Sequence, residues 1–336
     1  MTVPTAVIGA GAWGTALAWL LAGKEGPTRL WAYEADVADQ INRERENRRY
    51  LPGIILPGTL QASASLPDVL DGAGALIIVV PSHVAAGVVA QIAPHLPSGI
   101  PIVSATKGLE EKRGRSISTL LEELLPVPTG SVFALSGPSF AIEVCRGLPT
   151  AVVLAGGGAT EASLLQRLLM TPAFRIYLGG DRLGVELGGA LKNVIAVAAG
   201  IADGLGFGHN TRAALITRGL AEMVRLGRAM GADPRTFAGL SGMGDLVLTC
   251  TGALSRNRAV GFQLGEGKTL TAILAESDSV AEGVNTARVA LTLAERHHVE
   301  MPIVRAVCAV LFEGKEPVRA VSELMERAAR HELDQA

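Results

Sequence analysis

Three glycines near the start of the chain constrain its fold more than any other feature. Gly9, Gly11 and Gly14 form the pattern G-x-G-x-x-G directly after the apolar run TAVIG, and they open the helical stretch GTALAWLLAG. In a strand-to-helix turn such glycines allow a tight reversal, a close approach of the backbone to a ligand, and close packing of helix on strand. The pattern predicts a βαβ unit whose helix presents free N–H groups to a pyrophosphate. A plain strand-to-helix turn is the alternative, because such triplets also arise by chance in a chain with 40 glycines.

The end of the next expected strand indicates which dinucleotide would bind. That strand ends at Tyr33 and is followed by Glu34, which lies 20 residues after Gly14. The fingerprint places an acid about 20 residues beyond its glycines, where it accepts hydrogen bonds from the adenosine ribose. A carboxylate there would repel the 2′-phosphate of NADP, so NAD is the expected cofactor and NADP the alternative. A solvated glutamate after a strand is the competing interpretation.

Short apolar runs alternate with helical stretches through the first half of the chain. Runs that are apolar at every position, such as LIIVV, suit a parallel sheet covered on both faces by helices. After about residue 180 the strand signals stop, and apolar residues recur at helical spacing. We therefore predict an α/β fold with an N-terminal Rossmann-type dinucleotide-binding domain, residues 1–180, followed by an all-α C-terminal substrate-binding and catalytic domain, residues 181–332. The expected strands are Ala6–Ile8, Arg29–Tyr33, Leu76–Val80, Ile102–Ala105, Val132–Leu135 and Ala151–Leu154.

Charge and cysteine usage exclude several classes of protein. A formal net charge of −2 provides no field that would attract nucleic acid or an anionic membrane, so the expected partner is a small molecule. The three cysteines, Cys145, Cys250 and Cys308, form no CxxC or Cys/His grouping. Neither a disulfide framework nor a metal site is expected.

We expect neither a targeting segment nor a membrane-spanning segment in this chain. The N-terminus leads straight into a strand and a glycine turn, with no basic region and no cleavable apolar stretch. Lys192 and Asn193 interrupt the apolar run from Leu187 to Ala202, so no segment is expected to meet the roughly 20-residue requirement for spanning a bilayer. The expected location is the cytoplasm.

Two lysines stand at positions suited to chemistry. Lys107, in SATKGLE, follows a buried-looking strand at its carboxyl end, the edge at which open α/β sheets bind ligands. Lys192 and Asn193 lie in the middle of the apolar stretch VELGGALKNVIAVAAGIADG, where an isolated ammonium needs a partner or a ligand. The alternatives are a surface lysine at the start of a loop for the first, and a lysine snorkelling from a helix surface for the second.

A third polar group lies in LSGMGDLVLTCTGALSRNRAVG. Asp245 and Thr249 are four residues apart, so they share one face if this stretch is helical. Arg256 and Asn257 follow in the cluster SRNR, which begins at Ser255, and together offer a planar fork and an amide to a phosphate or carboxylate. An ordinary charged start of a helix is the alternative.

With these residues in place, the chain closely resembles the NAD(P)-dependent glycerol-3-phosphate dehydrogenase family over nearly its whole length. The resemblance implies an oxidoreductase that interconverts dihydroxyacetone phosphate and sn-glycerol 3-phosphate by hydride transfer with NAD(H), supplying glycerol 3-phosphate for phospholipid synthesis. It is compatible with a homodimer. The matching stretches are GAGAWGTALA, RYLPG, VPSH, SATKGLE, SGPSFA, ELGGALKNVIAVAAG, ITRGLAEM, GMGDLVLTC, SRNR and VAEGV.

The resemblance also implies roles for individual residues. Lys192 is the implied catalytic lysine, supported by Asp245 and Thr249, and Lys107 reaches both cofactor and substrate. The residues implied to bind the substrate are Lys107, Gly137, Ser139, Lys192, Asn193, Asp245, Ser255, Arg256 and Asn257, the last two at its phosphate. Those implied to border the nucleotide are Gly9, Gly11, Ala12, Trp13, Gly14, Tyr33, Glu34, Tyr50, Lys107, Ala141, Arg256, Val280 and Glu282.

The chain departs from the family pattern at three places. Ala12 stands where serine is usual, which removes a hydroxyl contact to the cofactor and leaves Trp13 to pack. Tyr33 and Glu34 stand where many bacterial members have a basic pair, which argues against NADP. His209 stands where aspartate is common, and the sequence assigns it no role.

Two rival functions share parts of this pattern. Another two-domain reductase, of the 2-hydroxyacid or ketopantoate type, would keep the glycine turn and a helical lysine but recognise a carboxylate, so substrate turnover distinguishes it. A regulator that senses a dinucleotide without turning it over is disfavoured, because no basic DNA-binding segment is present.

Overall fold

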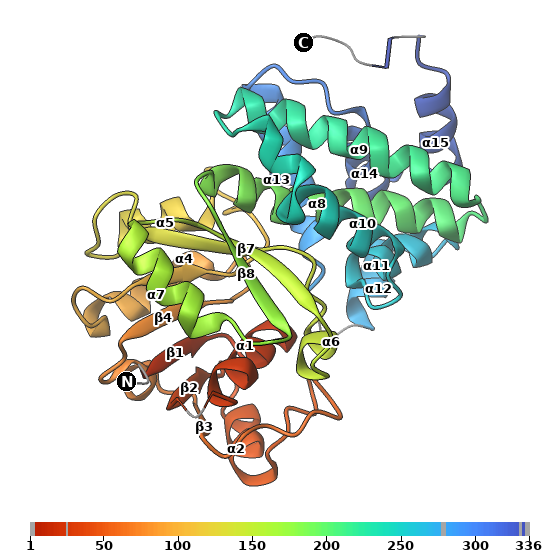
Figure 1. Cartoon of the computed structure of the whole chain (residues 1–336). Helices are drawn as coiled ribbons and strands as arrows, with labels where there is room; N and C mark the ends of the chain where they lie inside the picture. Colours follow the sequence, from red (N-terminus) through yellow and green to blue (C-terminus); the bar gives the residue numbers. More distant parts are fainter. Residues whose placement is uncertain (1–3, 25, 277–279, 329–330, 333–336) are drawn as a thin grey trace. The chain divides into compact units, whose positions relative to one another are not determined.

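The computed structural model describes residues 4–24, 26–276, 280–328 and 331–332, and it divides into two compact units (Figure 1). The first unit extends to Glu110 and resumes over Arg115–Glu186. The second unit takes in Glu111–Gly114 and the chain from Leu187 onward. The domain boundary predicted after residue 180 stays a prediction.

The first unit contains one eight-stranded sheet, in the order β3-β2-β1-β4-β5-β6-β7-β8. Its first six strands have the order of a dinucleotide-binding fold, in which ligands bind beyond the carboxyl ends of the strands. Neighbouring strands are parallel, except that β7 runs antiparallel to β6. The strands are β1 (Thr5–Ile8), β2 (Thr28–Trp31), β3 (Leu60–Ser63), β4 (Ala75–Ile78), β5 (Ile102–Ser104), β6 (Val132–Ser136), β7 (Thr150–Gly156) and β8 (Phe174–Gly179).

Alternate residues of each inner strand feed two different hydrophobic clusters, one on each face of the sheet. Val7 and Ile77 belong to one cluster, whereas Ala6 and Leu76 belong to the other. All four side chains are fully buried, which explains why these strands are apolar at every position. The helices that cover the sheet are α1 (Ala12–Ala22), α2 (Ala35–Glu44), α3 (Leu66–Leu70), α4 (Ala85–Ile92), α5 (Ile117–Leu124), α6 (Ala141–Cys145) and α7 (Ala159–Leu169), with a 3₁₀ turn at Ala93–His95.

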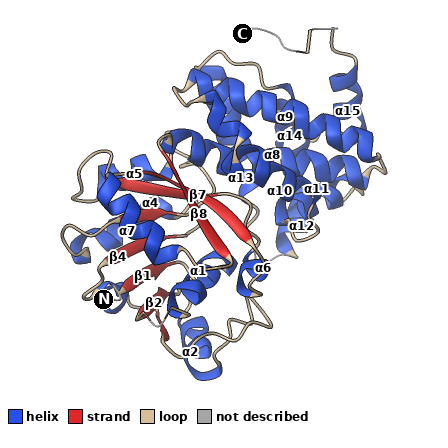
Figure 2. Ribbon diagram, viewed as in Figure 1, coloured by secondary structure: helices blue, strands red, loops and turns tan. Residues whose placement is uncertain are grey.

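From Arg182 onward the described chain is helical, as the blue ribbons of Figure 2 show, and this confirms the predicted fold class. Helix α8 (Arg182–Gly204) begins in the first unit and continues into the second. The helices that follow are α9 (His209–Ala229), α10 (Asp245–Thr251), α11 (Arg256–Gly265), α12 (Leu270–Ala275), α13 (Glu282–Arg296), α14 (Pro302–Phe312) and α15 (Pro317–Met325), with a 3₁₀ turn η2 (Pro234–Ala238) and a π-helical turn η3 (Leu240–Gly244) before α10.

Two expectations about the elements need correction. The predicted strands omitted β3 and β8; β3 carries an exposed Gln61 and β8 carries exposed Arg175 and Tyr177, so neither presents a continuous apolar run. The prediction that no segment meets the requirement for a membrane span was wrong for α8, which is long and apolar enough by length and composition. The apolar window of α8 is entirely buried inside the protein, as in the core helix of a globular domain.

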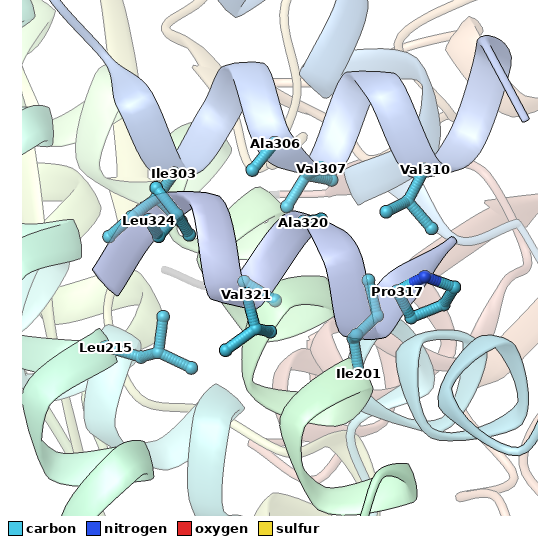
Figure 3. A pocket seen from close by; sticks show the side chains of 11 residues that line it. Ile201, Leu215, Ile303, Ala306, Val307, Val310, Pro317, Ala320, Val321 and Leu324 are labelled. Atoms are coloured by element: carbon cyan, nitrogen blue, oxygen red, sulfur yellow. The ribbon is translucent and has the colours of Figure 1, made fainter. Parts of the chain in front are cut away.

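A small apolar cavity lies within the second unit, between α14 and α15 and against α8 and α9 (Figure 3). Its walls include Ile201, Leu215, Val307 and Val321, and every residue that lines it is apolar. None of the residues predicted to bind substrate or cofactor lines this cavity. It is a gap in the packing of helices rather than a place for a polar substrate.

Candidate active site

The glycine turn after β1 has the geometry that a pyrophosphate needs. Gly9 adopts φ +117°, and a Cβ there would lie 2.7 Å from the Val79 carbonyl oxygen. A Cβ at Gly14 would collide with the Gly9 carbonyl, whereas one at Gly11 would meet nothing within 4 Å. Two glycines thus allow the turn and the helix packing, and Gly11 leaves open space at the N-terminus of α1. This backbone fits a dinucleotide pyrophosphate.

The predicted ribose acid is held by two neighbours in the same unit. Glu34, the N-cap residue of α2, follows β2, and its Oε1 accepts a 2.8 Å hydrogen bond from Tyr50 Oη. Arg49 Nη1 lies 3.7 Å from the same oxygen. Tyr33 is 80 % exposed. The structure therefore brings Glu34 and Tyr50 together and leaves Tyr33 beside them on the surface.

Lys107 meets the other predicted residues of the first unit at the edge of the sheet. Its Nζ donates to the Gly137 carbonyl oxygen at 2.7 Å and to Ser139 Oγ at 3.2 Å, and it lies 5.8 Å from the centre of the Trp13 ring. Lys107 follows β5 and Gly137 follows β6. Because these strands are parallel neighbours, their carboxyl ends meet at one edge. Ala141 begins α6 a few residues further on.

Trp13 packs as expected next to the glycine turn. Its ring centre lies 6.4 Å from that of Phe174, and Ala12 before it begins α1. The indole Nε1 is buried without a hydrogen-bond partner among the described residues. A buried donor of this kind usually has a partner, so Trp13 Nε1 is one of the exceptions among the buried polar atoms of this unit.

In the second unit, Lys192 lies in a fully formed polar cluster. Its Nζ donates to Asp245 Oδ1 and to Thr249 Oγ1, both at 2.7 Å. Thr249 Oγ1 in turn donates to the Asp245 carbonyl oxygen at 2.6 Å. Lys192, Asp245 and Thr249 are 5 %, 1 % and 4 % exposed. The buried ammonium therefore has a countercharge, which is what its apolar surroundings require.

Backbone contact explains why α8 and α10 meet at this point. A Cβ at Gly188 would lie 2.5 Å from the Ser241 carbonyl oxygen, so only glycine lets α8 approach the turn η3 so closely. One helical turn further along each segment, Lys192 and Asp245 face each other on the same side. The sequence showed Lys192 and Asp245 as polar residues in separate stretches, and the close approach at Gly188 brings these two stretches together.

Asn193 and Asn257 form a second buried pair. Asn257 Nδ2 donates to Asn193 Oδ1 at 2.9 Å, and Asn257 Oδ1 accepts from the Gly283 backbone N–H at 2.8 Å. Asn193 Nδ2 donates to the Gly189 carbonyl oxygen at 3.2 Å. These bonds tie α8, α11 and the start of α13 together beside Lys192.

The remaining residues predicted to bind substrate or cofactor lie at the starts of α11 and α13. Ser255 is the N-cap residue of α11, and its Oγ accepts a hydrogen bond from the Arg258 backbone N–H at 3.2 Å. Arg256 is the first residue of the helix, and it is exposed. Glu282 begins α13, and Val280 lies just before it, half-buried.

Sequence reasoning missed the residue that anchors this end of α11. Asp203 Oδ1 contacts Arg212 Nη2 at 2.5 Å, and its Oδ2 accepts from Arg258 Nε at 2.7 Å. The Asp203 side chain is 4 % exposed. The available signal was an acid near the end of a helix that is mostly apolar. His209 lies 3.3 Å from Arg212 through its Nδ1, at the edge of this ion cluster.

Glycines also set the spacing of α8 and α11. A Cβ at Gly200 would collide with the Arg258 carbonyl and lie 2.8 Å from the Phe262 nitrogen. A Cβ at Gly261 would lie 2.9 Å from the Ile201 nitrogen. The two helices thus touch backbone to backbone, which brings Arg256 and Asn257 close to the helix that carries Lys192.

Comparison with known proteins shows the family to which this chain belongs. Residues 4–162 match the family described as the NAD-dependent glycerol-3-phosphate dehydrogenase N-terminus, and residues 181–322 match its C-terminus. The chain belongs to the NAD-dependent glycerol-3-phosphate dehydrogenase family. A glycerol-3-phosphate dehydrogenase [NAD(P)+] of Geobacter sulfurreducens is 55 % identical over 97 % of this chain and 98 % of its own length. That of Syntrophobacter fumaroxidans is 50 % identical over 98 % of each chain.

A solved structure of a glycerol-3-phosphate dehydrogenase has the same fold as this chain. The glycerol-3-phosphate dehydrogenase of Coxiella burnetii superposes with a TM-score of 0.93 at 42 % identity, covering 97 % of this chain and 99 % of its own. A ketopantoate reductase of Ralstonia eutropha reaches a TM-score of 0.60 at 15 % identity, covering 96 % of this chain and all of its own, and shares the fold alone. Among the described residues no group of three or more His, Cys, Asp or Glu side chains could hold a metal ion.

Proposed function

We propose that this chain is an NAD(H)-dependent glycerol-3-phosphate dehydrogenase that interconverts dihydroxyacetone phosphate and sn-glycerol 3-phosphate. The observation that carries the proposal is the buried ammonium of Lys192 on Asp245 and Thr249. Desolvating such a pair costs on the order of several kcal/mol per ion, and a proton donor held in place would account for that cost. The relatives named glycerol-3-phosphate dehydrogenase support the choice of substrate.

Lys192 has the position and chemistry of a proton donor. The dihydronicotinamide ring of bound NADH supplies the hydride. As the carbonyl carbon of the substrate accepts it, negative charge grows on the carbonyl oxygen, which the Lys192 ammonium stabilises and then protonates from Nζ. Asp245 and Thr249 orient the ammonium throughout.

Arg256 and Asn257 serve the other end of the substrate. The guanidinium of Arg256 can grip a phosphate with two N–H bonds, and Asn257 can add its second amide N–H. Since the Asn193–Asn257 bond joins α11 to α8, a phosphate held there has a defined distance from Lys192. A handle of this kind fixes the reacting carbon and lowers the entropy lost on reaching the transition state.

In the first unit we assign the pyrophosphate to the turn at Gly9, Gly11 and Gly14. Glu34 receives the adenosine ribose. Lys107, held by Gly137 and Ser139, contacts the nucleotide and the substrate. Its ammonium attracts their phosphates, and the ring of Trp13, whose centre lies 5.8 Å from Lys107 Nζ, supports it.

A direct assay tests the function. Purified full-length protein is mixed with NADH and dihydroxyacetone phosphate, and the loss of NADH absorbance is followed, with ketopantoate and a 2-keto acid as rival substrates. We expect turnover with dihydroxyacetone phosphate alone, and turnover at least about a hundredfold slower with Lys192→Ala, which controls for a contaminating enzyme. Turnover of ketopantoate instead would establish the alternative reductase. Cofactor binding without turnover of any substrate would favour the regulator.

The proposed product places the enzyme in metabolism. Glycerol 3-phosphate is the backbone onto which acyl chains are esterified, so the enzyme would supply phospholipid synthesis. The cytoplasmic location and the homodimer stay predictions from the sequence.

A further inference from the structure

The turn that carries Arg49 and Tyr50 is fastened to the glycine turn. Asn47 is fully buried and donates through Nδ2 to the Ala10 carbonyl oxygen and to Thr15 Oγ1, both at 2.8 Å. Its Oδ1 accepts from the Tyr50 backbone N–H at 3.2 Å. Ala10 lies between the first two glycines of the fingerprint. The residues after Asn47 therefore have a fixed position relative to the place where a pyrophosphate binds.

A cation stands beside the acid that is expected to meet the ribose. Arg49 Nη1 lies 3.7 Å from Glu34 Oε1, and the Arg49 guanidinium carbon lies 5.3 Å from the centre of the Tyr50 ring. The Tyr50 hydroxyl donates to that same carboxylate oxygen at 2.8 Å. Tyr50 thus holds both charged groups, one by its hydroxyl and one by its ring face.

The contact between Arg49 and Glu34 is suited to being exchanged. The two side chains are 39 % and 28 % exposed, and a surface ion pair at such a distance contributes little to stability. A guanidinium matches the geometry of a phosphate better than that of a single carboxylate oxygen at this distance. Turning from Glu34 to an arriving phosphate therefore requires little free energy.

We propose that Arg49 receives the 2′-phosphate of NADPH, so that one ribose site accepts NADH through Glu34 and NADPH through Arg49. The proposal rests on the dinucleotide site assigned under the proposed function. Arg49 then determines, together with Glu34, how strongly the site prefers NADH over NADPH. The carboxylate still favours NADH, but the neighbouring cation limits how strongly NADPH is rejected.

The neighbouring arginine provides a matched control. Arg48 carries the same charge one residue earlier, but its guanidinium lies 3.1 Å from Glu44 and 3.2 Å from Glu46 rather than beside Glu34. Removing Arg48 changes the net charge as much as removing Arg49. Only the latter removes the cation from the ribose acid.

The test measures binding without turnover. Dissociation constants for NADH and NADPH are determined by fluorescence titration of the full chain and of Arg49→Ala and Arg48→Ala, at low and at high salt. For Arg49→Ala we expect the NADPH constant to rise about tenfold and the NADH constant to stay within about twofold, because a charge-assisted contact to phosphate is lost. For Arg48→Ala we expect the ratio of the two constants to stay unchanged. Salt should weaken NADPH binding less in Arg49→Ala than in the parent.

Several results would overturn the proposal. Equal weakening of both nucleotides by Arg49→Ala would assign the residue a structural role, and equal effects of the two variants would show a general effect of charge. Failure of the parent chain to bind NADPH would also exclude it. Because no substrate is present, a failure to reduce dihydroxyacetone phosphate would contradict the proposed function and leave these binding results intact.

Discussion

Lys107 and Lys192 show two ways of holding an ammonium at a site. Lys192 is 5 % exposed and donates to a carboxylate and a hydroxyl, whereas Lys107 is half-buried and donates to a carbonyl oxygen and a hydroxyl. A charge taken fully out of water needs a countercharge, while one at the edge of a sheet keeps part of its hydration. The two contacts described for Lys107 are to neutral oxygens, which hold its ammonium at the edge of the sheet. The difference in burial agrees with the roles proposed above, in which Lys192 donates the proton and Lys107 attracts phosphate.

The largest expected effect comes from removing Lys192. Loss of a positioned general acid lowers a rate by about 10²- to 10⁴-fold, so Lys192→Ala should reduce kcat at least about a hundredfold. NADH affinity, measured by fluorescence titration, should hardly change. Lys192→Arg should rescue little, since arginine keeps the charge but gives up a proton far less readily.

Circular dichroism must first show that the Lys192→Ala variant is folded. If this folded variant keeps kcat within about threefold of the parent, a barrier change under roughly 0.7 kcal/mol, Lys192 is not the proton donor. If Lys107→Ala instead removes kcat while substrate and cofactor affinities stay intact, the roles of the two lysines are exchanged.

The second prediction concerns the countercharge of Lys192. Asp245→Asn keeps the shape of the side chain but leaves the buried ammonium with neutral partners only among the contacts described. Breaking a buried pair from one side typically costs about 3–5 kcal/mol, and we expect the free energy of unfolding to fall by roughly 3 kcal/mol at neutral pH. Urea unfolding of parent and variant measures this. A loss below about 1 kcal/mol would mean that the Asp245 charge hardly stabilises the ammonium.

Glu222 is a buried acid to set beside the two lysines, and burial favours its neutral, protonated form. Its carboxylate accepts from the backbone N–H groups of Ile303, at 2.7 Å, and Val304, at 3.2 Å, at the start of α14. Burial raises the pKa of Glu222 to about 7, although these bonds and the charges of Arg225 and Arg327 lower it. The folded protein therefore binds a proton more tightly than the unfolded chain, and stability falls as pH rises from about 4.5 to about 7.

The fall in the free energy of unfolding can be measured by comparison with a variant that has no titratable group at residue 222. A pKa difference of this kind corresponds to a loss on the order of 3 kcal/mol across the window. The difference in unfolding free energy between the parent and Glu222→Gln, followed by urea unfolding at several pH values, should shift in favour of the variant as pH rises through 7. A difference that is flat with pH would show that Glu222 titrates normally.

The smallest effect is expected at Ser139. Ser139→Ala removes one of the neutral partners of Lys107 and leaves the Gly137 carbonyl in place. A hydrogen bond of this type contributes about 0.5–1.5 kcal/mol, so the KM for dihydroxyacetone phosphate should rise by no more than about tenfold with kcat nearly unchanged. A loss of kcat comparable to that of Lys192→Ala would contradict the division of roles between the lysines.

Much of the fold and part of the site could be predicted from local sequence. Runs such as LIIVV predicted the inner strands because a strand covered on both faces must be apolar throughout. Lys192 could be found because an ammonium is conspicuous in an apolar helix. The pairing of Asn193 with Asn257 and of Asp203 with Arg258 could not, because these partners lie 64 and 55 residues apart and nothing local links them. Roles assigned to individual site residues stay predictions until the variants are made.

The backbone contact between α8 and α11 has a consequence for how such an enzyme can change. Since Gly200 and Gly261 let main-chain atoms touch, the distance between the Lys192 region and the Arg256 region is set by the peptide backbone. Substitutions of the side chains around a substrate then leave the frame unaltered. If Arg256 holds the substrate as proposed, new substrate preferences can arise one side chain at a time there, whereas a methyl group added at either glycine would force the two helices apart.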